Sequence, residues 1–77
     1  MIIVNQDQNI IINMDSTGII ENDCELGDTR FRISVWTRLD MWRIIGFYQT
    51  EKRAKAVLQE IVQAYITDEK CYYMPKE

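Results

Sequence analysis

Histidine is absent from this 77-residue chain, and glycine, cysteine and proline are scarce, with three, two and one residues. The absence of histidine removes the commonest general acid or base and a principal zinc ligand. Three scattered glycines cannot build a phosphate-binding loop, and no GxSxG nucleophile motif is present. Cys24 and Cys71 form no CxxC motif, so we expect two reduced, buried structural thiols. We therefore predict a protein without catalytic activity, bound metal or cofactor.

Carboxylates are the one catalytic group that the chain supplies in quantity. Five of them cluster in the first third of the sequence: Asp15, Glu21, Asp23, Glu25 and Asp28. Such groups can act as general acids or bases, but a domain this small has no obvious enclosed pocket. A loop beginning at Asp15 also lacks the DxDxDG pattern of a calcium site. We interpret the cluster as a solvated acidic hairpin, and an unfamiliar carboxylate site is the enzymatic alternative.

Long apolar runs are missing as well. The longest, such as residues 10–12, fall far short of the roughly 20 residues needed to cross a bilayer. The amino terminus lacks the basic residue and small-residue cleavage site of a secretory signal. We predict a cytoplasmic protein without membrane contact. Its length is that of a single domain, residues 1–77, which buries roughly 60 to 65% of the surface of the unfolded chain.

The net charge of −3 hides a separation of charges along the chain. Residues 1–29 carry six acids and no base, a charge of −6; residues 30–55 carry seven bases and two acids, a charge of +5; the remainder carries −2. This asymmetry can steer a charged partner toward the protein. It can equally arise from strand pairing, because an opposed pair of opposite charges stabilises a sheet by up to about 1 kcal/mol. We favour pairing, since the two stretches adjoin in sequence.

The pattern of apolar residues predicts a run of short strands followed by one helix. We expect strands over residues 2–5, 10–14, 19–24, 30–36 and 41–48, the first two as a hairpin, and a short closing strand over 71–74 at a sheet edge. The stretch 41–48 is apolar on both sides, so we expect it to be central or covered on both faces. The predicted fold class is α+β, with an antiparallel curved sheet of about five strands packed on one C-terminal helix.

Two registers are open for the hairpin formed by residues 30–48. The favoured one places Trp36 opposite Trp42, and the alternative slips by one residue and places Trp36 opposite Met41. The favoured register groups Phe31, Ile33, Ile45 and Phe47 under the helix. In both registers strand alternation places Arg30, Arg32 and Trp36 on one face.

The predicted helix spans residues 50–66. Thr50 is suited to cap its first turn, and Glu51 places a negative charge at the positive end of the helix dipole. One apolar stripe follows at three- and four-residue spacing, widened by Val62, and we expect it to be the buried face: Ala54, Val57, Leu58, Ile61 and Tyr65.

Two segments carry a resemblance to known proteins. Residues 45–61 read IGFYQTEKRAKAVLQEI, a strand ending in Gly-x-Tyr-x-Thr-Glu before an amphipathic helix, and residues 2–7 read IIVNQD. Together they resemble small uncharacterised proteins of Gram-positive bacteria and their phages, over about a third of the chain. The pattern is structural, so the resemblance transfers no functional residue. It implies a cytoplasmic or prophage origin and a protein that binds another macromolecule. The Arg- and Trp-rich stretch 30–43 departs from the pattern.

Function is predicted from aromatic and arginine residues, which are enriched among binding hot spots. We predict partner-binding residues Arg30, Arg32, Trp36 and Trp42, in a phage-derived, non-enzymatic module that binds a protein or self-associates as a homo-oligomer. One alternative is that the aromatic residues only complete the core. Another is a single-stranded nucleic-acid binder, because exposed aromatic groups stack on unpaired bases. An isoelectric point near 4.8 disfavours nucleic acid.

Overall fold

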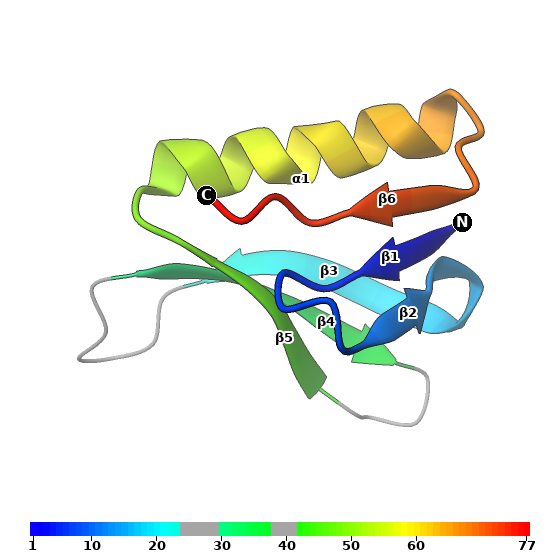
Figure 1. Cartoon of the computed structure of the whole chain (residues 1–77), viewed down its shortest axis with the longest axis horizontal. Helices are drawn as coiled ribbons and strands as arrows, with labels where there is room; N and C mark the ends of the chain where they lie inside the picture. The colour runs from blue at the N-terminus through cyan, green and yellow to red at the C-terminus, as the bar shows by residue number, and fades with distance from the viewer. Residues whose placement is uncertain (24–29, 38–41) are drawn as a thin grey trace.

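The computed structural model describes residues 1–23, 30–37 and 42–77. Along the chain these residues form β1 (Ile2–Val4), β2 (Ile11–Asn13), the 3-10 turn η1 (Met14–Ser16), β3 (Thr17–Asp23), β4 (Phe31–Thr37), β5 (Trp42–Tyr48), α1 (Glu51–Ile66) and β6 (Cys71–Tyr73) (Figure 1). The predicted α+β class is confirmed. The prediction of a buried thiol at Cys24 lies outside the described residues, and Cys71 is a half-buried free cysteine.

The strands form two sheets of three strands, so the prediction of one curved five-stranded sheet is wrong. The first sheet has the order β2-β1-β6 and the second the order β3-β4-β5. The chain leaves β2 through η1 and begins a new sheet at β3 instead of pairing β3 with β2. The predicted hairpin of β1 and β2 and the closing strand at a sheet edge are confirmed. β6 runs parallel to β1, which requires the long crossover that the intervening chain supplies.

The second sheet is an antiparallel meander with a bulge in β5. Trp36 lies opposite Trp42, as in the favoured register, and the pairing continues in step to Ser34 and Ile44. There the register shifts, and Ile33 lies opposite Gly46. A bulge inserts one extra residue and reverses the alternation beyond it.

The bulge corrects the predicted core at this strand. Ile45 is buried, as expected, but Phe47 pairs with Arg32 and lies on the opposite face of the sheet. Tyr48 takes the core position that alternation assigned to Phe47, and it is almost completely buried. β5 is also at the edge of its sheet rather than at the centre. The bulge leaves Ile45 as an extra residue before Gly46, so Phe47 and Tyr48 lie on the faces opposite to those that simple alternation assigned to them.

Gly46 allows the Tyr48 ring to enter the core. A Cβ atom at this position would lie 3.1 Å from the Tyr48 ring and 3.3 Å from the terminal methyl carbon of Met74. Both distances are shorter than ordinary carbon-carbon contacts of about 3.5 to 4.0 Å. The close packing of these two side chains therefore depends on glycine here.

Helix α1 begins and ends with defined caps. Thr50 has an extended backbone, and its Oγ1 accepts a hydrogen bond from the Arg53 amide at 3.1 Å, which confirms the predicted N-cap. At the other end Asp68 adopts a left-handed conformation with φ of 60°, and the Glu69 amide donates to the Ala64 carbonyl at 2.9 Å. This six-to-one bond is typical of a Schellman turn. No helix in the described part of the chain is long and apolar enough to cross a membrane.

The buried face of α1 differs from the prediction by a small rotation. Ala54, Val57 and Ile61 are buried as expected, and Ala64 joins them. Leu58 is only half-buried at the margin of the core, and Tyr65 is exposed, so placing Tyr65 in the core was wrong.

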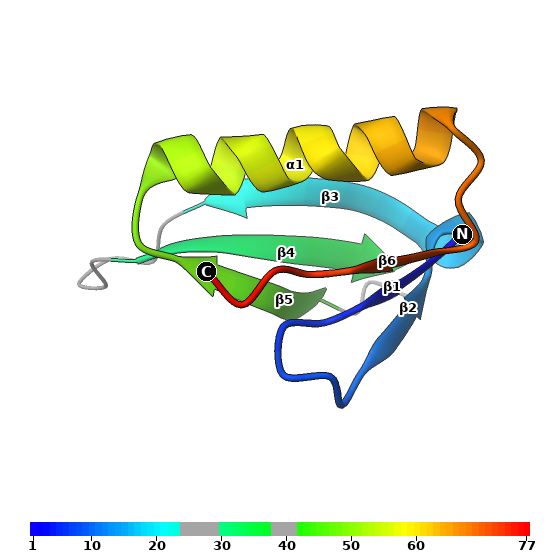
Figure 2. The ribbon, with the colours of Figure 1, turned by 45° about the horizontal axis from the view of Figure 1, so that its top comes forward.

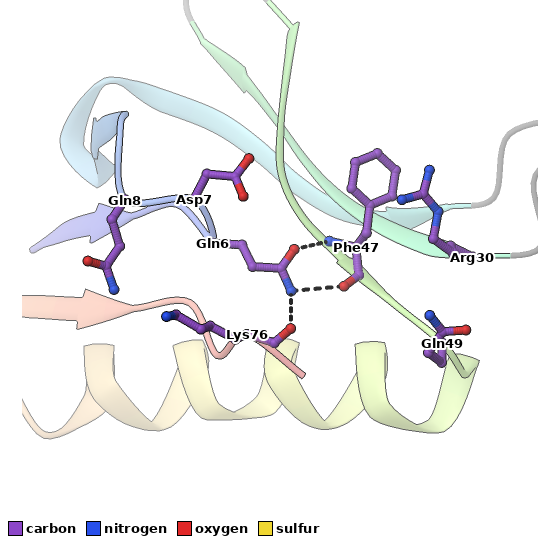
Figure 3. A pocket seen from close by; sticks show the side chains of 7 residues that line it. All are labelled: Gln6, Asp7, Gln8, Arg30, Phe47, Gln49 and Lys76. Carbon is purple, nitrogen blue, oxygen red and sulfur yellow. Dashed lines mark hydrogen bonds between the residues drawn. The ribbon is translucent and has the colours of Figure 1, made fainter.

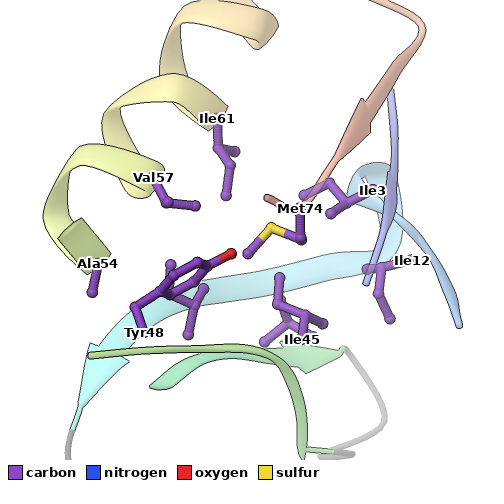
Figure 4. Packing of buried hydrophobic residues seen from close by; sticks show 10 residues of the cluster. Ile3, Ile12, Ile45, Tyr48, Ala54, Val57, Ile61 and Met74 are labelled. Atoms are coloured by element: carbon purple, nitrogen blue, oxygen red, sulfur yellow. The ribbon is translucent and has the colours of Figure 1, made fainter. Parts of the chain in front are cut away.

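One core unites the helix and both sheets. α1 lies along the β3-β4-β5 sheet, while β1 and β6 run beside it (Figure 2). Ile3 and Ile12 enter the core from the first sheet, and they meet buried side chains of the second sheet, the helix and the final segment (Figure 4). These other members are Ile33, Val35, Ile45, Tyr48, Ala54, Val57, Ile61 and Met74.

The side chain of Gln6 joins the two sheets at the bulge. The backbone amide of Gln6 donates to the Ile45 carbonyl at 2.8 Å. Its side-chain oxygen accepts from the Phe47 amide at 2.8 Å, and its Nε2 donates to the carbonyl oxygens of Phe47, Pro75 and Lys76 at 2.9, 3.1 and 2.8 Å. Gln6 thus covers the free edge of β5 and holds the segment that follows β6.

We predict that Gln6→Ala lowers the free energy of unfolding by about 2 to 4 kcal/mol, because several polar contacts worth about 0.5 to 1.5 kcal/mol each are lost together. Urea denaturation measures the change. Gln49→Ala is the matched control, since Gln49 is exposed and no hydrogen bond of its side chain is recorded in the described structure; it should shift the value by no more than about 0.5 kcal/mol. Equal effects of the two substitutions would rule out the joining role of Gln6.

We predict that Ile61→Ala lowers the free energy of unfolding by about 2 to 5 kcal/mol, because Ile61 is a buried residue of the corrected core. Tyr65→Ala should change the free energy of unfolding by less than about 0.5 kcal/mol, because its side chain is exposed. The midpoints of urea titrations give both values. A larger loss for Tyr65→Ala would restore the original assignment of the helix face.

Candidate functional site

The β3-β4-β5 sheet has one side that α1 does not cover. Among the side chains that the structure describes, strand alternation and register place eight there, which we call the outer face: Glu21, Asp23, Arg32, Ser34, Trp36, Trp42, Ile44 and Phe47. The helix contacts the opposite side of the same strands. The outer face contains three of the four predicted partner-binding residues.

The two tryptophans form the centre of the outer face. Their ring centroids are 6.4 Å apart and the ring planes are tilted by 48°. Trp36 is 38% exposed and Trp42 is 36% exposed. Neither side chain therefore belongs to the core, which removes the alternative in which both only complete it.

Polar contacts hold both tryptophan rings in place. Arg32 Nε donates to Asp23 Oδ1 at 2.5 Å, and its guanidinium carbon lies 4.7 Å from the centre of the Trp42 ring. Trp36 Nε1 donates to Glu21 Oε1 at 3.0 Å. Asp23 and Arg32 are direct cross-strand neighbours, so the internal pairing of acidic and basic stretches is confirmed for this pair.

Ser34 lies beneath these side chains and is completely buried. Its neighbours on the same face of β4 are Arg32 and Trp36, and the Trp42 ring is close to both, which places the ring over Ser34. Within the described part of the chain, Ser34 Oγ has no hydrogen-bond partner. A buried hydroxyl without a partner destabilises the fold by about 1 to 3 kcal/mol.

Arg30 packs on Phe47, a residue of the outer face. Its guanidinium carbon lies 4.1 Å from the centre of the Phe47 ring. Both residues line an open polar cavity of about 710 Å³ between the β1-β2 turn, β5 and the final segment (Figure 3). The other lining residues are Gln6, Asp7, Gln8, Gln49 and Lys76. The sequence did not reveal this cavity, because the bulge that turns Phe47 toward Arg30 breaks the alternation.

Buried Tyr48 and half-buried Tyr72 both have raised pKa values. Burial raises the pKa of Tyr48 to about 12, and its hydroxyl donates to the Pro75 carbonyl at 2.8 Å. Burial, reinforced by the Glu60 carboxylate, raises the pKa of Tyr72, whose hydroxyl donates to Glu60 Oε1 at 3.2 Å. Both phenols are therefore protonated at neutral pH and act as hydrogen-bond donors.

The acidic cluster is divided between different roles. Glu21 and Asp23 accept hydrogen bonds on the outer face, and Asp15 is exposed. Glu25 and Asp28 lie outside the described residues. Among the residues that the structure describes, no three His, Cys, Asp or Glu side chains are grouped to hold a metal ion.

No protein-family model, curated protein or solved structure matches this chain.

The buried hydroxyl leads to a testable expectation: Ser34→Ala should raise the free energy of unfolding by about 1 kcal/mol, because it removes a buried polar atom that has no partner. Thermal or urea unfolding measures the gain. Thr50→Ala serves as the opposite control, since loss of the helix cap should lower stability by about 1 kcal/mol. A loss of stability in Ser34→Ala would mean that the hydroxyl has a partner.

Proposed function

We propose that this protein is a small binding module that docks a partner protein on the outer face. The observation that carries the proposal is the contacting pair Trp36 and Trp42, each more than one-third exposed on the side of the sheet that the helix leaves open. Its origin in a phage or prophage and its cytoplasmic location remain predictions from the resemblance.

Contacts within the chain hold several side chains of this face in place. Glu21 fixes the Trp36 indole, and Arg32 is held between Asp23 and the Trp42 ring. Binding immobilises each flexible side chain at a cost of about 0.5 to 1.5 kcal/mol, and prior ordering reduces this cost. Two indole rings also offer a large apolar area with directed edges, as binding hot spots do. The arrangement fits a partner that contributes apolar or aromatic side chains.

Charge on the outer face favours protein over nucleic acid. Glu21 accepts a hydrogen bond from Trp36, and Asp23 pairs with Arg32, whose guanidinium lies over the Trp42 ring. A phosphate backbone drawn to Arg32 would meet two carboxylates at short range, in a chain whose net charge is already −3. Nucleic-acid binding and self-association through the outer face are the alternatives, and photo-crosslinking distinguishes both from the binding of a partner protein.

Site-specific photo-crosslinking in the encoding organism tests the proposal. The crosslinking residue p-benzoylphenylalanine replaces Trp42 in one variant and Tyr73, an exposed aromatic residue of β6, in the control. We expect a protein adduct from position 42, none of the same mass from position 73, and loss of the adduct when Trp36→Ala is added. The binding constant of the identified partner should weaken at least about 30-fold in Trp36→Ala, the loss typical of a hot spot.

Several outcomes would overturn the proposal. A nuclease-sensitive adduct would assign the outer face to nucleic acid, and an adduct of twice the chain mass would assign it to self-association. Absence of any adduct specific to position 42, with circular dichroism showing an intact helix, would remove the outer face as a docking site.

A further inference from the structure

Three aromatic rings lie on the outer face, and two of them carry a cation from the chain itself. The guanidinium carbon of Arg30 lies 4.1 Å from the centre of the Phe47 ring, and that of Arg32 lies 4.7 Å from the centre of the Trp42 ring. Such stacking is favourable because the face of an aromatic ring carries negative potential. Within the described residues, the third ring, that of Trp36, has no cation over it, although Trp36 is 38% exposed.

The two carboxylates of the outer face differ in the same way. Asp23 accepts a hydrogen bond from Nε of Arg32, which also stacks on the Trp42 ring. We call this acid, cation and ring the arginine group. Glu21 accepts at Oε1 from Trp36 Nε1 at 3.0 Å, a hydrogen bond from an uncharged donor. In the part of the chain that the structure describes, no Lys or Arg forms an ion pair with Glu21.

We propose that the partner protein places an arginine side chain on the Trp36 ring, with its guanidinium paired to Glu21. Glu21 and Trp36 supply the acid and the ring of a second arginine group, and the partner supplies the cation. The net charge of −3 also attracts a basic partner at long range. The inference rests on the proposed function, because it names a residue that the partner contributes to the outer face.

The chemistry of the position favours arginine over lysine. A guanidinium is planar, so it can lie flat on an indole ring while its edge donates hydrogen bonds to a carboxylate. The Trp36 indole occupies Oε1 of Glu21, and among the described residues no hydrogen bond reaches Oε2. The bond between Trp36 and Glu21 is itself exposed to solvent, so an incoming side chain can reach the ring and the carboxylate together.

The binding of two short peptides to the full chain tests the inference. One peptide is acetyl-Leu-Arg-Leu amide, and the other carries citrulline, the uncharged analogue of arginine, at its centre. The indole N–H signals of the protein in NMR spectra follow both titrations. We expect the arginine peptide to shift the Trp36 signal and to bind at least about fivefold more tightly than the citrulline peptide, the gain from one cation–π contact and one exposed ion pair.

Glu21→Gln is the deciding variant. Its amide oxygen can still accept from the Trp36 indole, but its charge is lost. The variant should therefore bind the arginine peptide no more tightly than the citrulline peptide. Glu69→Gln is the matched control, because it makes the same chemical change at an exposed residue beyond α1 and should leave both affinities unchanged. Circular dichroism verifies that both variants are folded.

The outcomes separate this inference from the docking proposal. Equal affinities of the two peptides for the wild-type chain would overturn the inference, and so would a preference for arginine that survives Glu21→Gln. Both results leave the docking proposal standing if the crosslink at position 42 identifies a partner protein. A preference for arginine that Glu21→Gln removes, without any crosslinked partner, would reject the docking proposal and retain the arginine site.

Discussion

The fold depends on one polar side chain that connects two incomplete sheets. Each sheet has three strands, and β5 has a free edge where its bulge disturbs the ladder. Gln6 supplies the missing donor and acceptor to Phe47, in the manner of a paired strand, and it also holds the carbonyl oxygens of Pro75 and Lys76. A glutamine suits this position because its side-chain amide has the donor and acceptor geometry of a peptide group.

The bulge, Gly46 and Tyr48 act together at the same point. The bulge turns Tyr48 inward, the lack of a side chain at Gly46 gives its ring space, and its hydroxyl donates to the Pro75 carbonyl. The segment after β6 is thereby held from two directions, by Gln6 and by Tyr48. Met74 inserts into the core between these contacts, and a short edge strand gains tertiary support that three residues of pairing do not provide alone.

A chain of this length cannot bury all its apolar side chains, and several of those left exposed lie on the outer face and on α1. On the outer face, polar contacts with Glu21, Asp23 and Arg32 order the indoles of Trp36 and Trp42. On α1, the exposed Val62 and Tyr65 side chains line a mostly apolar groove with Met14 and Ile20. The polar contacts of the outer face suit it to a directed contact.

By itself the sequence determined the local elements: the Thr50 cap, the helix to Ile66, the first hairpin, the strand positions to within two residues and the common face of Arg32 and Trp36. These depend on propensity, capping and alternation, which act between near neighbours. The tertiary structure alone decided the division into two sheets, the parallel pairing of β6, the exchange of Phe47 for Tyr48, the burial of Ala64 in place of Tyr65, and the contact of Arg30 with the Phe47 ring. Each of these rests on a contact between residues distant in sequence, above all those of Gln6 with β5, and no local pattern encodes such a contact.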